Sequence, residues 1–308
     1  MNMRLTLDSL QVLDAIDRKG SFAAAAEELF RVPSAMTYTV QKLEQDLGVV
    51  LFNRSGHRAK LTAAGEELLK EGRYLLRAAS DLENRVKRVA TGWEVQLNIA
   101  YDDILPIDRL LPLIEDFYRE TCDTRVRLTA EVLAGSWDAL ISNRADLVIA
   151  APGDGPPGGG YGTQLLGYLE WAFAVAPTHP LAALPEPLSR EQILAHRAVA
   201  VADSSRSLPP RTAGLFSGQD TLTVHNMRAK RKAQEAGLGV GHLPRYFALS
   251  SVAAGRLIIK QVEEVKPPLP LYIAWRSNQP GKALEWFLQR LVEPGFAARL
   301  LPSELTPA

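Results

Sequence analysis

The chain has 308 residues, a length that predicts two or three domains because a single domain usually holds about 100–200 residues. Its content of 46% hydrophobic and 23% charged residues is that of an ordinary globular protein and excludes wholesale disorder. Lys plus Arg and Asp plus Glu balance at 35 each, so any nucleic-acid contact must come from local clustering of charge. The single cysteine, Cys122, excludes an intramolecular disulfide and a cysteine-based zinc site.

The first residues carry no targeting signal. Residues 1–10 include Arg4 and Asp8 and lack the apolar run of a signal peptide. Apolar stretches elsewhere are interrupted well short of the roughly 18 residues that a transmembrane helix needs. We therefore expect a cytoplasmic protein.

Three short helices are expected at the start of the chain. In the first, Leu10, Leu13 and Ile16 recur at helical spacing before a basic stop signal and a glycine. Ser21 caps a second helix that is rich in alanine, and a third begins at Ser34. Together they form the helical part of a small N-terminal domain.

A basic hairpin follows the third helix. Residues 50–53 and 58–61 flank a turn at 54–57, which predicts two short strands, or a wing. Residues 31–60 hold five basic and two acidic groups, whereas residues 1–30 hold three basic and five acidic ones. Three helices and a basic hairpin predict a winged helix-turn-helix, whose last helix enters the major groove of DNA.

Candidate DNA contacts lie on the outer face of the third helix and around the wing. The helix offers groups that reach base edges and phosphates, and the basic side chains contact phosphates. The helix residues are Ser34, Thr37, Tyr38 and Lys42, and the phosphate set is Arg31, Arg54, Arg58 and Lys60. The alternative is that the outer face is simply solvated.

Residues 62–92 contain no proline and predict one helix of about 46 Å. Apolar residues repeat every seven positions, and small residues between them would permit close approach of a second helix. The repeat consists of Leu61, Leu68, Leu75, Leu82 and Val89, interleaved with Gly65, Gly72, Ala79 and Val86. This stripe predicts a dimer contact; the alternative is packing on the chain's own N-terminal domain.

From Trp93 onward, strands alternate with helices, which predicts βαβ units and a doubly wound sheet. A run rich in proline and glycine at 152–160 interrupts the pattern. We expect strands at 95–100, 125–132, 146–150, 169–176, 197–202, 238–241, 257–260 and 271–275, and helices at 106–121, 136–143, 189–195, 226–236, 244–253 and 281–292.

The segment from Ser21 to Gly65 resembles the N-terminal signature of LysR-type transcriptional regulators, and the resemblance extends over the whole chain. It combines the small-residue second helix with several linked motifs. These are Lys42-Leu43-Glu44, Leu47-Gly48, Leu51-Phe52-Asn53-Arg54 and Leu61-Thr62-Ala63-Ala64-Gly65. The chain departs from the family pattern at Pro33, Tyr38 and Thr39, where glutamine, arginine and glutamine are usual, so the operator sequence does not carry over.

The resemblance implies an α/β architecture: a winged helix-turn-helix, a long dimerising linker helix, and a two-lobed, periplasmic-binding-protein-like effector domain. It further implies a homodimer, or a homotetramer of paired dimers, that binds double-stranded promoter DNA and a small-molecule effector. The expected domains are 1–61, 62–92 and 93–308, the last with lobe I at 93–166 and 267–308 and lobe II at 167–266.

The effector is expected between the lobes, where doubly wound folds leave a crevice at the carboxyl ends of their strands. Loops that follow predicted strands supply the candidates. They are Asp102, Asp103, Glu131, Ser136, Trp137, Asp203, Ser204, Ser205, His225 and Asn226.

Two roles are open for the acidic pair. Asp103 can cap a helix that begins near Ile104 while Asp102 is solvated. Alternatively both carboxylates face the cleft, where they would favour a cationic or hydroxylated aromatic ligand stacked on Trp137 or His225.

Enzymatic and metal chemistry have no support in the sequence. The five histidines form no HExxH pair, no serine lies in GxSxG, and Cys122 has no resolving partner for a redox switch. The glycine-rich runs at 155–160 and 237–241 lack the features of nucleotide loops. We expect a transcriptional regulator without cofactor or metal; the rival is a cytosolic solute-binding module or an enzyme whose N-terminal helices merely pack.

Overall fold

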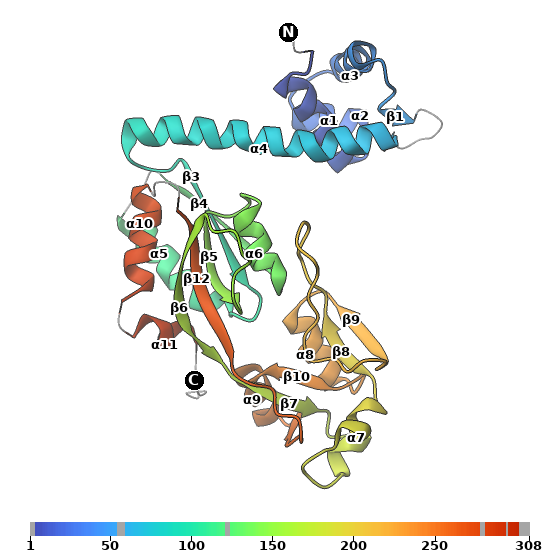
Figure 1. Cartoon of the computed structure of the whole chain (residues 1–308), viewed down its shortest axis with the longest axis vertical. Coiled ribbons are helices and arrows are strands. Elements are labelled where there is room, and N and C mark those ends of the chain that lie inside the picture. The colour runs from blue at the N-terminus through green and yellow to red at the C-terminus, as the bar shows by residue number, and fades with distance from the viewer. Residues whose placement is uncertain (1–3, 54–58, 121–123, 278–280, 294, 302–308) are drawn as a thin grey trace. The chain divides into compact units, whose positions relative to one another are not determined.

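The computed structural model describes residues 4–53, 59–120, 124–277, 281–293 and 295–301. The chain divides into two compact units, Met1–Val86 and Lys87–Ala308, and each is described by itself (Figure 1). The predicted contacts Arg54 and Arg58, together with Cys122, lie outside the described residues.

The first unit contains the three expected helices and the strands of the hairpin. Thr6 and Ser9 form a capping box at the first helix, which ends at Gly20 in the left-handed conformation. Ser21 caps the second helix by accepting a hydrogen bond from the Ala24 amide. The elements are α1 (Leu7–Lys19), α2 (Phe22–Glu28), α3 (Pro33–Leu47), β1 (Phe52–Asn53), β2 (Lys60–Leu61) and α4 (Ala63–Thr91).

The core of this unit fixes which face of α3 points outward. Met36, Val40 and Leu43 are buried among side chains of α1 and α2. The Glu44 carboxylate accepts hydrogen bonds from the amides of Leu51 (2.7 Å) and Phe52 (3.2 Å), which ties the C-terminal part of α3 to the first strand of the hairpin.

The glycines of α4 serve a different purpose from the one expected. A Cβ at Gly65 would lie 2.3 Å from the carbonyl oxygen of Leu51, and one at Gly72 would lie 2.6 Å from Leu10 Cδ2. These glycines therefore let α4 approach its own domain, not a partner helix, and the first half of the heptad stripe packs there. The second half remains exposed: Leu75, Leu82, Val86 and Val89.

The second unit contains two lobes. Lobe I is built on a five-stranded sheet of order β4-β3-β5-β12-β6. Strands β3, β4 and β5 are parallel, as the expected βαβ units require, but β12 runs antiparallel to β5 and β6, so the sheet is mixed. The strands are β3 (Gln96–Asp102), β4 (Arg125–Glu131), β5 (Leu147–Pro152), β6 (Tyr161–Leu169) and β12 (Leu269–Arg276).

Helices cover both faces of this sheet. On one face Phe117 and Phe287 pack with ring centroids 4.8 Å apart, and on the other Trp137 and Leu140 form a separate core. The helices of lobe I are η1 (Ile107–Arg109), α5 (Leu111–Glu120), α6 (Ala134–Ile141), α10 (Lys282–Leu291) and α11 (Phe296–Leu300). The single helix expected at 106–121 is thus divided, and the strand at 161–169 and the helix at 296–300 were not anticipated.

Lobe II contains a three-stranded antiparallel sheet of order β10-β7-β11 and a parallel pair, β8-β9. Strand β9 and the 3-10 helix η2 were not anticipated, and the strand expected at 238–241 begins only at Gly241. The elements are β7 (Trp171–Val175), η2 (Pro180–Ala183), α7 (Arg190–Leu194), β8 (Ala198–Val201), β9 (Thr221–Val224), α8 (Met227–Glu235), β10 (Gly241–Pro244), α9 (Arg245–Ala253) and β11 (Ile258–Lys260).

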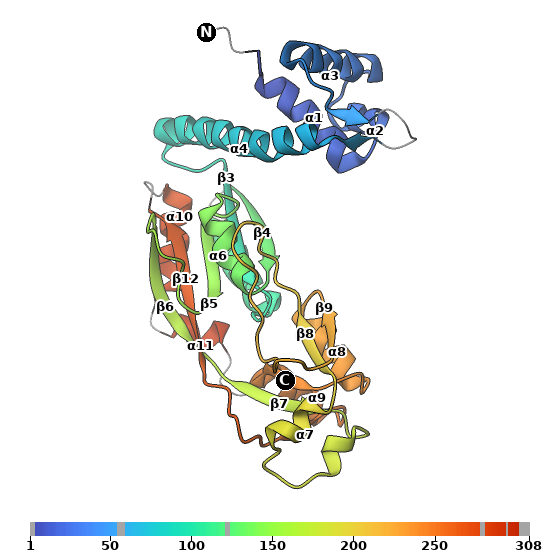
Figure 2. The same ribbon diagram turned by 45° about the vertical axis from the view of Figure 1, so that its right-hand side comes forward.

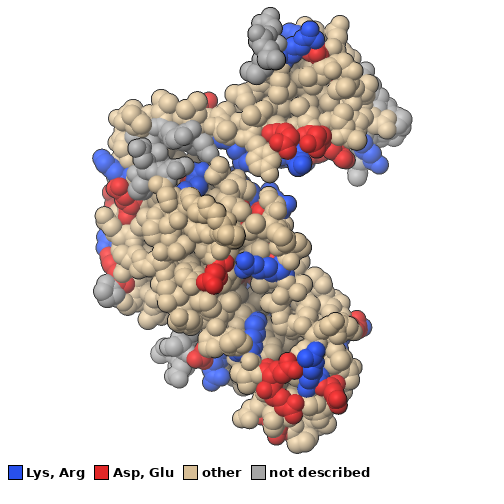
Figure 3. Space-filling model, viewed as in Figure 1, with Lys and Arg blue, Asp and Glu red and all other residues tan. Residues whose placement is uncertain are grey.

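Surface charge on the second unit is mixed. On the face shown in Figure 3, acidic and basic side chains lie side by side on both lobes, and neither sign forms a continuous patch there. No helix in the described parts of the chain is long and apolar enough to span a bilayer.

Candidate functional site

The outward face of α3 presents four of the predicted DNA contacts together. Ser34, Thr37, Tyr38 and Lys42 are exposed, and the Tyr38 side chain has 65% of its surface accessible. The Thr37 hydroxyl donates to the carbonyl of Pro33 at 3.1 Å, which leaves its oxygen lone pairs facing solvent. This face offers hydroxyl, phenol and ammonium groups, the kinds that contact bases and phosphates.

The basic residues around this face differ in how available their charge is. Arg31 forms a two-pronged ion pair with Asp8, which raises the pKa of Arg31 and offsets its charge within the domain. Lys60 is exposed on β2. Arg4, which we did not select from the sequence, lines a groove with Tyr38 and Lys42 and so adds a cation beside α3.

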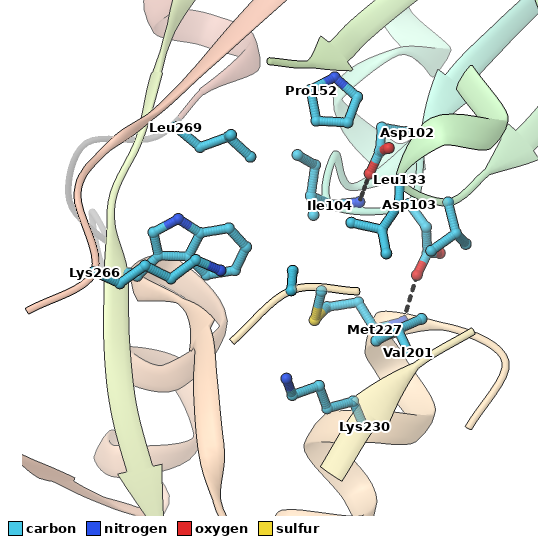
Figure 4. A pocket seen from close by; sticks show the side chains of 13 residues that line it. Asp102, Asp103, Ile104, Leu133, Pro152, Val201, Met227, Lys230, Lys266 and Leu269 are labelled. Carbon is cyan, nitrogen blue, oxygen red and sulfur yellow. Dashed lines mark hydrogen bonds between the residues drawn. The ribbon is translucent and has the colours of Figure 1, made fainter. Parts of the chain in front are cut away.

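A cavity opens between the two lobes of the second unit (Figure 4). Lobe I contributes its acidic pair and several apolar side chains, and lobe II contributes an indole ring and two lysines. Its volume is near 40 Å³, room for little more than one water molecule. The lining residues are Asp102, Asp103, Ile104, Val132, Leu133, Pro152, Trp171, Val201, Ala213, Met227, Lys230, Lys266 and Leu269.

Asp102 is buried at the C-terminal end of β3, not solvated as one alternative held. Its carboxylate accepts hydrogen bonds from the Ile104 amide at 3.1 Å and from the Ser136 hydroxyl at 3.0 Å. Burial raises the pKa of Asp102 to about 7, although these hydrogen bonds oppose the rise. The Asp102 carboxylate is therefore engaged by donors from lobe I itself, one in its own loop and one on α6.

Asp103 connects the two lobes. Its carboxylate accepts a hydrogen bond from the backbone amide of Met227, the first residue of α8. Burial raises the pKa of Asp103, and the bond from Met227 counters part of that rise. The expected cap near Ile104 is wrong, because the next helix starts only at Ile107 and Asp103 caps a helix of the other lobe.

The predicted residues Glu131, Asp203 and Ser204 form a second connection between the lobes, and Ser205 supports it from within lobe II by bonding to Asp203 and Leu208. Ser204 accepts a hydrogen bond from the Val132 amide at 2.8 Å and donates to Glu131. Asp203 accepts from the Ala134 amide at 3.1 Å and from the Ser205 amide at 2.7 Å. The lining of the cavity does not include these four residues, whose hydrogen bonds hold the lobes together beside it.

Asp138 on α6 extends this connection. Its carboxylate is buried and accepts from the amides of Ser207 at 2.9 Å and Leu208 at 3.0 Å, and it pairs with Arg144 at 2.8 Å. Arg144 in turn pairs with Glu131. The segment between β8 and β9 thus reaches from lobe II to α6 of lobe I (Figure 2). We call this hydrogen-bonded segment, residues 203–208, the interlobe strap.

Four other predicted residues are absent from the lining of the interlobe cavity. Trp137 is fully buried, donates to the Pro152 carbonyl at 3.1 Å and packs against Tyr161, so it has no ring face free for stacking. Ser136 is also buried and donates to Asp102. Asn226 caps α8 through the Ala229 amide at 2.7 Å, and His225 is exposed beside Asp103.

The structure supplies two cavity residues that the sequence analysis did not select. Lys230 lies on α8 with only 6% of its surface exposed, and the Lys266 ammonium lies 3.3 Å from the ring centroid of Trp171. Burial lowers the pKa of Lys230 to about 7, with a contribution from Lys266, and lowers that of Lys266 to about 8. The clue to Lys230 was its helical spacing from the apolar Met227 and Ala233, which places a lysine on a buried helix face.

Within the described residues, no three His, Cys, Asp or Glu side chains lie close enough together to hold a metal ion.

Comparison with known families gives two matches that together span most of the chain. Residues 7–66 match the family described as "Bacterial regulatory helix-turn-helix protein, lysR family", and residues 90–294 match "LysR substrate binding domain".

Individual relatives agree along nearly their whole length. The chain is 42% identical to the probable HTH-type transcriptional regulator YhaJ of Escherichia coli K12 over 287 residues, 93% of this chain and 96% of the relative. It is 38% identical to the HTH-type transcriptional regulator PunR of the same strain over 283 residues, 92% and 91% of the two chains. A crystal structure of CbnR, a LysR family transcriptional regulator, has a similar fold with a TM-score of 0.60, at 22% identity and covering 93% of this chain and 98% of that one.

Proposed function

The chain belongs to the LysR family of transcriptional regulators, and we propose that it binds operator DNA as a homodimer or homotetramer under the control of a small molecule held between its two lobes. It is a DNA-binding regulator, not an enzyme, and we propose that it acts in the cytoplasm. We assign the DNA-binding domain to residues 1–61, the linker helix to 62–92 and the effector domain to 93–308, with lobe I at 93–166 and 267–308 and lobe II at 167–266.

The outward face of α3 supports the DNA-binding assignment. Tyr38 and Lys42 are exposed on the last helix of the helix-turn-helix, the element that enters the major groove. Lys60 on β2, together with Arg54 and Arg58 between the two strands, is assigned to phosphate contacts. Arg31 contributes less because Asp8 offsets its charge.

The second half of α4 supports a dimer. In a single chain Leu75 and Leu82 are about half exposed, and Val86 and Val89 are more exposed still. A stripe of apolar side chains on one face of a helix is stabilised when a second helix covers it. The dimer contact is therefore assigned to this half of the helix.

The interlobe cavity supports control by an effector and is the observation that carries this part of the proposal. Both lobes line it, and Asp103 of lobe I is bonded to Met227 of lobe II at its edge. A ligand in this position contacts both lobes and so shifts the equilibrium between their arrangements. A ligand larger than a few atoms requires the lobes to open, since the cavity volume is near 40 Å³.

Footprinting of the DNA upstream of the protein's own gene and of the neighbouring genes, with and without candidate metabolites, tests the proposal. We expect protection of a site with two-fold symmetry, and a change in its extent when the correct metabolite is added. The absence of any protected site would contradict DNA regulation at these genes. A footprint that no metabolite alters would contradict control by an effector.

A further inference from the structure

Charges of opposite sign meet in the interlobe cavity, and they differ in how far the protein itself engages them. Asp102 is engaged by the Ile104 amide and the Ser136 hydroxyl, and Asp103 by the Met227 amide. Each carboxylate thus has donors from the protein itself. A cationic ligand would have to compete with these donors.

The ammonium groups are in the opposite situation. Within the described part of the chain, neither Lys230 nor Lys266 has a hydrogen-bond acceptor or an oppositely charged partner; the Lys266 ammonium lies over the face of the Trp171 ring. Lys230 is more than nine-tenths buried and points toward the cavity (Figure 4). A buried ammonium without an acceptor is unfavourable unless something else supplies the oxygen atoms.

A third nitrogen lies at the same place. His242 Nδ1 is buried and lacks a hydrogen-bond partner among the described residues. A Cβ built on Gly214 would lie 3.7 Å from this atom and 3.9 Å from Lys266 Nζ, so both nitrogens border the same glycine. Lys230 Nζ lies 3.6 Å from the corresponding position at Gly241, the residue before His242. The three groups repel one another when protonated, which a bound anion would relieve.

A second cavity adjoins this cluster inside lobe II. It has a volume near 230 Å³ and shares Lys266 with the interlobe cavity. Its walls are mainly apolar and include Phe173, Ile193 and Val240. Lys266 lines both cavities, Lys230 lines the interlobe cavity, and His242 lines the cavity of lobe II. Apolar side chains make up most of both walls, and the carboxylate in the second wall, Glu264, pairs with Arg190.

We propose that the effector is an organic anion, whose carboxylate is bound by Lys230 and Lys266 with His242 beside them and whose apolar body occupies the cavity of lobe II. This inference rests on the proposed function, since it names the ligand class of the same regulator. It replaces the cationic ligand that Asp102 and Asp103 suggested, because each of those carboxylates already accepts a hydrogen bond from the protein, whereas the two ammonium groups have no acceptor.

Three probes of matched shape and different charge test the proposal on the full chain: benzoate, benzamide and benzamidinium, with acetate as the anion without a ring. Calorimetry should show that benzoate binds more tightly than acetate, because the ring adds apolar contact. Benzamide and benzamidinium should bind at least about tenfold more weakly than benzoate, the loss expected without a charge-assisted hydrogen bond.

Substitutions identify the groups that hold the anion. Lys230→Met and Lys266→Met should each weaken benzoate binding about tenfold or more. Lys230→Arg keeps the charge and should retain the preference for benzoate over benzamide. Lys232→Met is the matched control, because Lys232 lies on the exposed side of the same helix, and it should leave benzoate binding unchanged. Circular dichroism and thermal unfolding of each variant verify that the fold is intact.

The proposal is overturned if benzamidinium binds more tightly than benzoate, if wild type does not distinguish benzoate from benzamide, or if folded Lys230→Met binds benzoate as wild type does. These binding measurements need no DNA, so a failure of the anion proposal can be distinguished from a failure of the proposed regulatory function. If benzoate binds but no operator footprint is found, the anion site is supported and regulation of the tested genes is contradicted. If a footprint is found but no anion binds, regulation of these genes is supported and the anion site is contradicted.

Discussion

The Asp103 carboxylate of lobe I accepts a hydrogen bond from the backbone amide of Met227, the first residue of α8 in lobe II, across 124 positions of sequence. A carboxylate at the first turn of a helix is favoured by the unpaired amides and the dipole there. This single contact therefore caps a helix and joins the lobes at the edge of the proposed effector cavity.

Removing this contact should loosen the lobes. Asp103→Ala leaves the Met227 amide without its acceptor, and we expect the free energy of unfolding of the second unit to fall by about 1–3 kcal/mol. Hydrogen exchange at the Met227 amide should become faster. Asp103→Asn retains an acceptor oxygen and should have a smaller effect on both quantities; equal exchange rates in wild type and Asp103→Ala would show that the contact does not protect this amide.

Asp138 of α6 should be the lobe I residue on which the interlobe strap depends most. Asp138→Ala leaves Arg144 without one carboxylate partner and the amides of Ser207 and Leu208 without acceptors, and we expect a loss of about 3–5 kcal/mol in the free energy of unfolding. Asp116→Ala is the matched control, because Asp116 pairs with Arg119 on an exposed helix face and should change stability by less than about 0.5 kcal/mol. Urea unfolding of the two variants checks this, and similar midpoints would refute the role of the strap.

The free energy of unfolding of the protein without added ligand should increase with pH in the alkaline range. The pKa of Lys230 is about 7 in the folded chain and 10.5 as the ordinary value, so the unfolded chain binds more protons between these limits. The free energy of unfolding therefore rises with pH from about 7 to about 10.5. Lys266 acts in the same direction above pH 8 or so, while His242 and Asp102 titrate at or below about pH 7.

Chemical unfolding at a series of pH values measures this rise. Lys230→Met should show a shallower rise than wild type, and Lys232→Met should match wild type. Saturating benzoate should also flatten the wild-type rise, because a bound anion favours the protonated ammonium. A wild-type stability that is level from pH 7 to 10 would count against a buried, unpaired Lys230.

A charge in the exposed stripe of α4 should prevent association without unfolding the monomer. Leu82 is 56% exposed in the single chain, so Leu82→Glu leaves the core of the monomer intact. In a dimer paired through α4 the same substitution buries an unpaired charge at the helix–helix contact, which we expect to cost several kcal/mol. Leu75→Glu should act in the same way. Lys70→Glu, at an exposed position of the same helix, is the control. Sedimentation equilibrium measures the oligomeric state of each variant. If both leucine variants remain dimers, α4 is not the dimer contact.

The two classes of DNA contact should separate in their salt dependence. Lys60→Ala removes a phosphate contact and should lower the slope of log K against log salt by about 0.9 for every DNA sequence alike. Tyr38→Ala should leave that slope nearly unchanged and reduce the discrimination between operator and unrelated DNA. Binding titrations at several salt concentrations provide both quantities. An unchanged slope for Lys60→Ala would remove that residue from the phosphate set.

Local spacing determined much of the DNA-binding domain. The buried positions Met36, Val40 and Leu43 recur at helical intervals, so the sequence by itself indicates which side of α3 is left to solvent, and Tyr38 and Lys42 follow from that. Helix caps such as Ser21 involve residues only a few positions apart, so they can also be predicted from the sequence. The linked motifs from residue 21 to 65 were sufficient for the family, whose match the comparisons confirm.

Only the tertiary structure decided which groups face the interlobe cavity. The hydrogen bond from the Met227 amide to the Asp103 carboxylate depends on how distant segments pack. The same holds for the close approach of Gly65 to Leu51 in the first unit. Trp137 had the chemistry of a ligand contact and is instead a core residue, whereas Lys230 and Lys266 lie in separate segments and meet only in the folded lobe. The physical reason is that periodicity reports whether a residue faces inward. Whether a buried charged side chain is left without a hydrogen-bonding or oppositely charged partner depends on which distant segments the fold brings next to it.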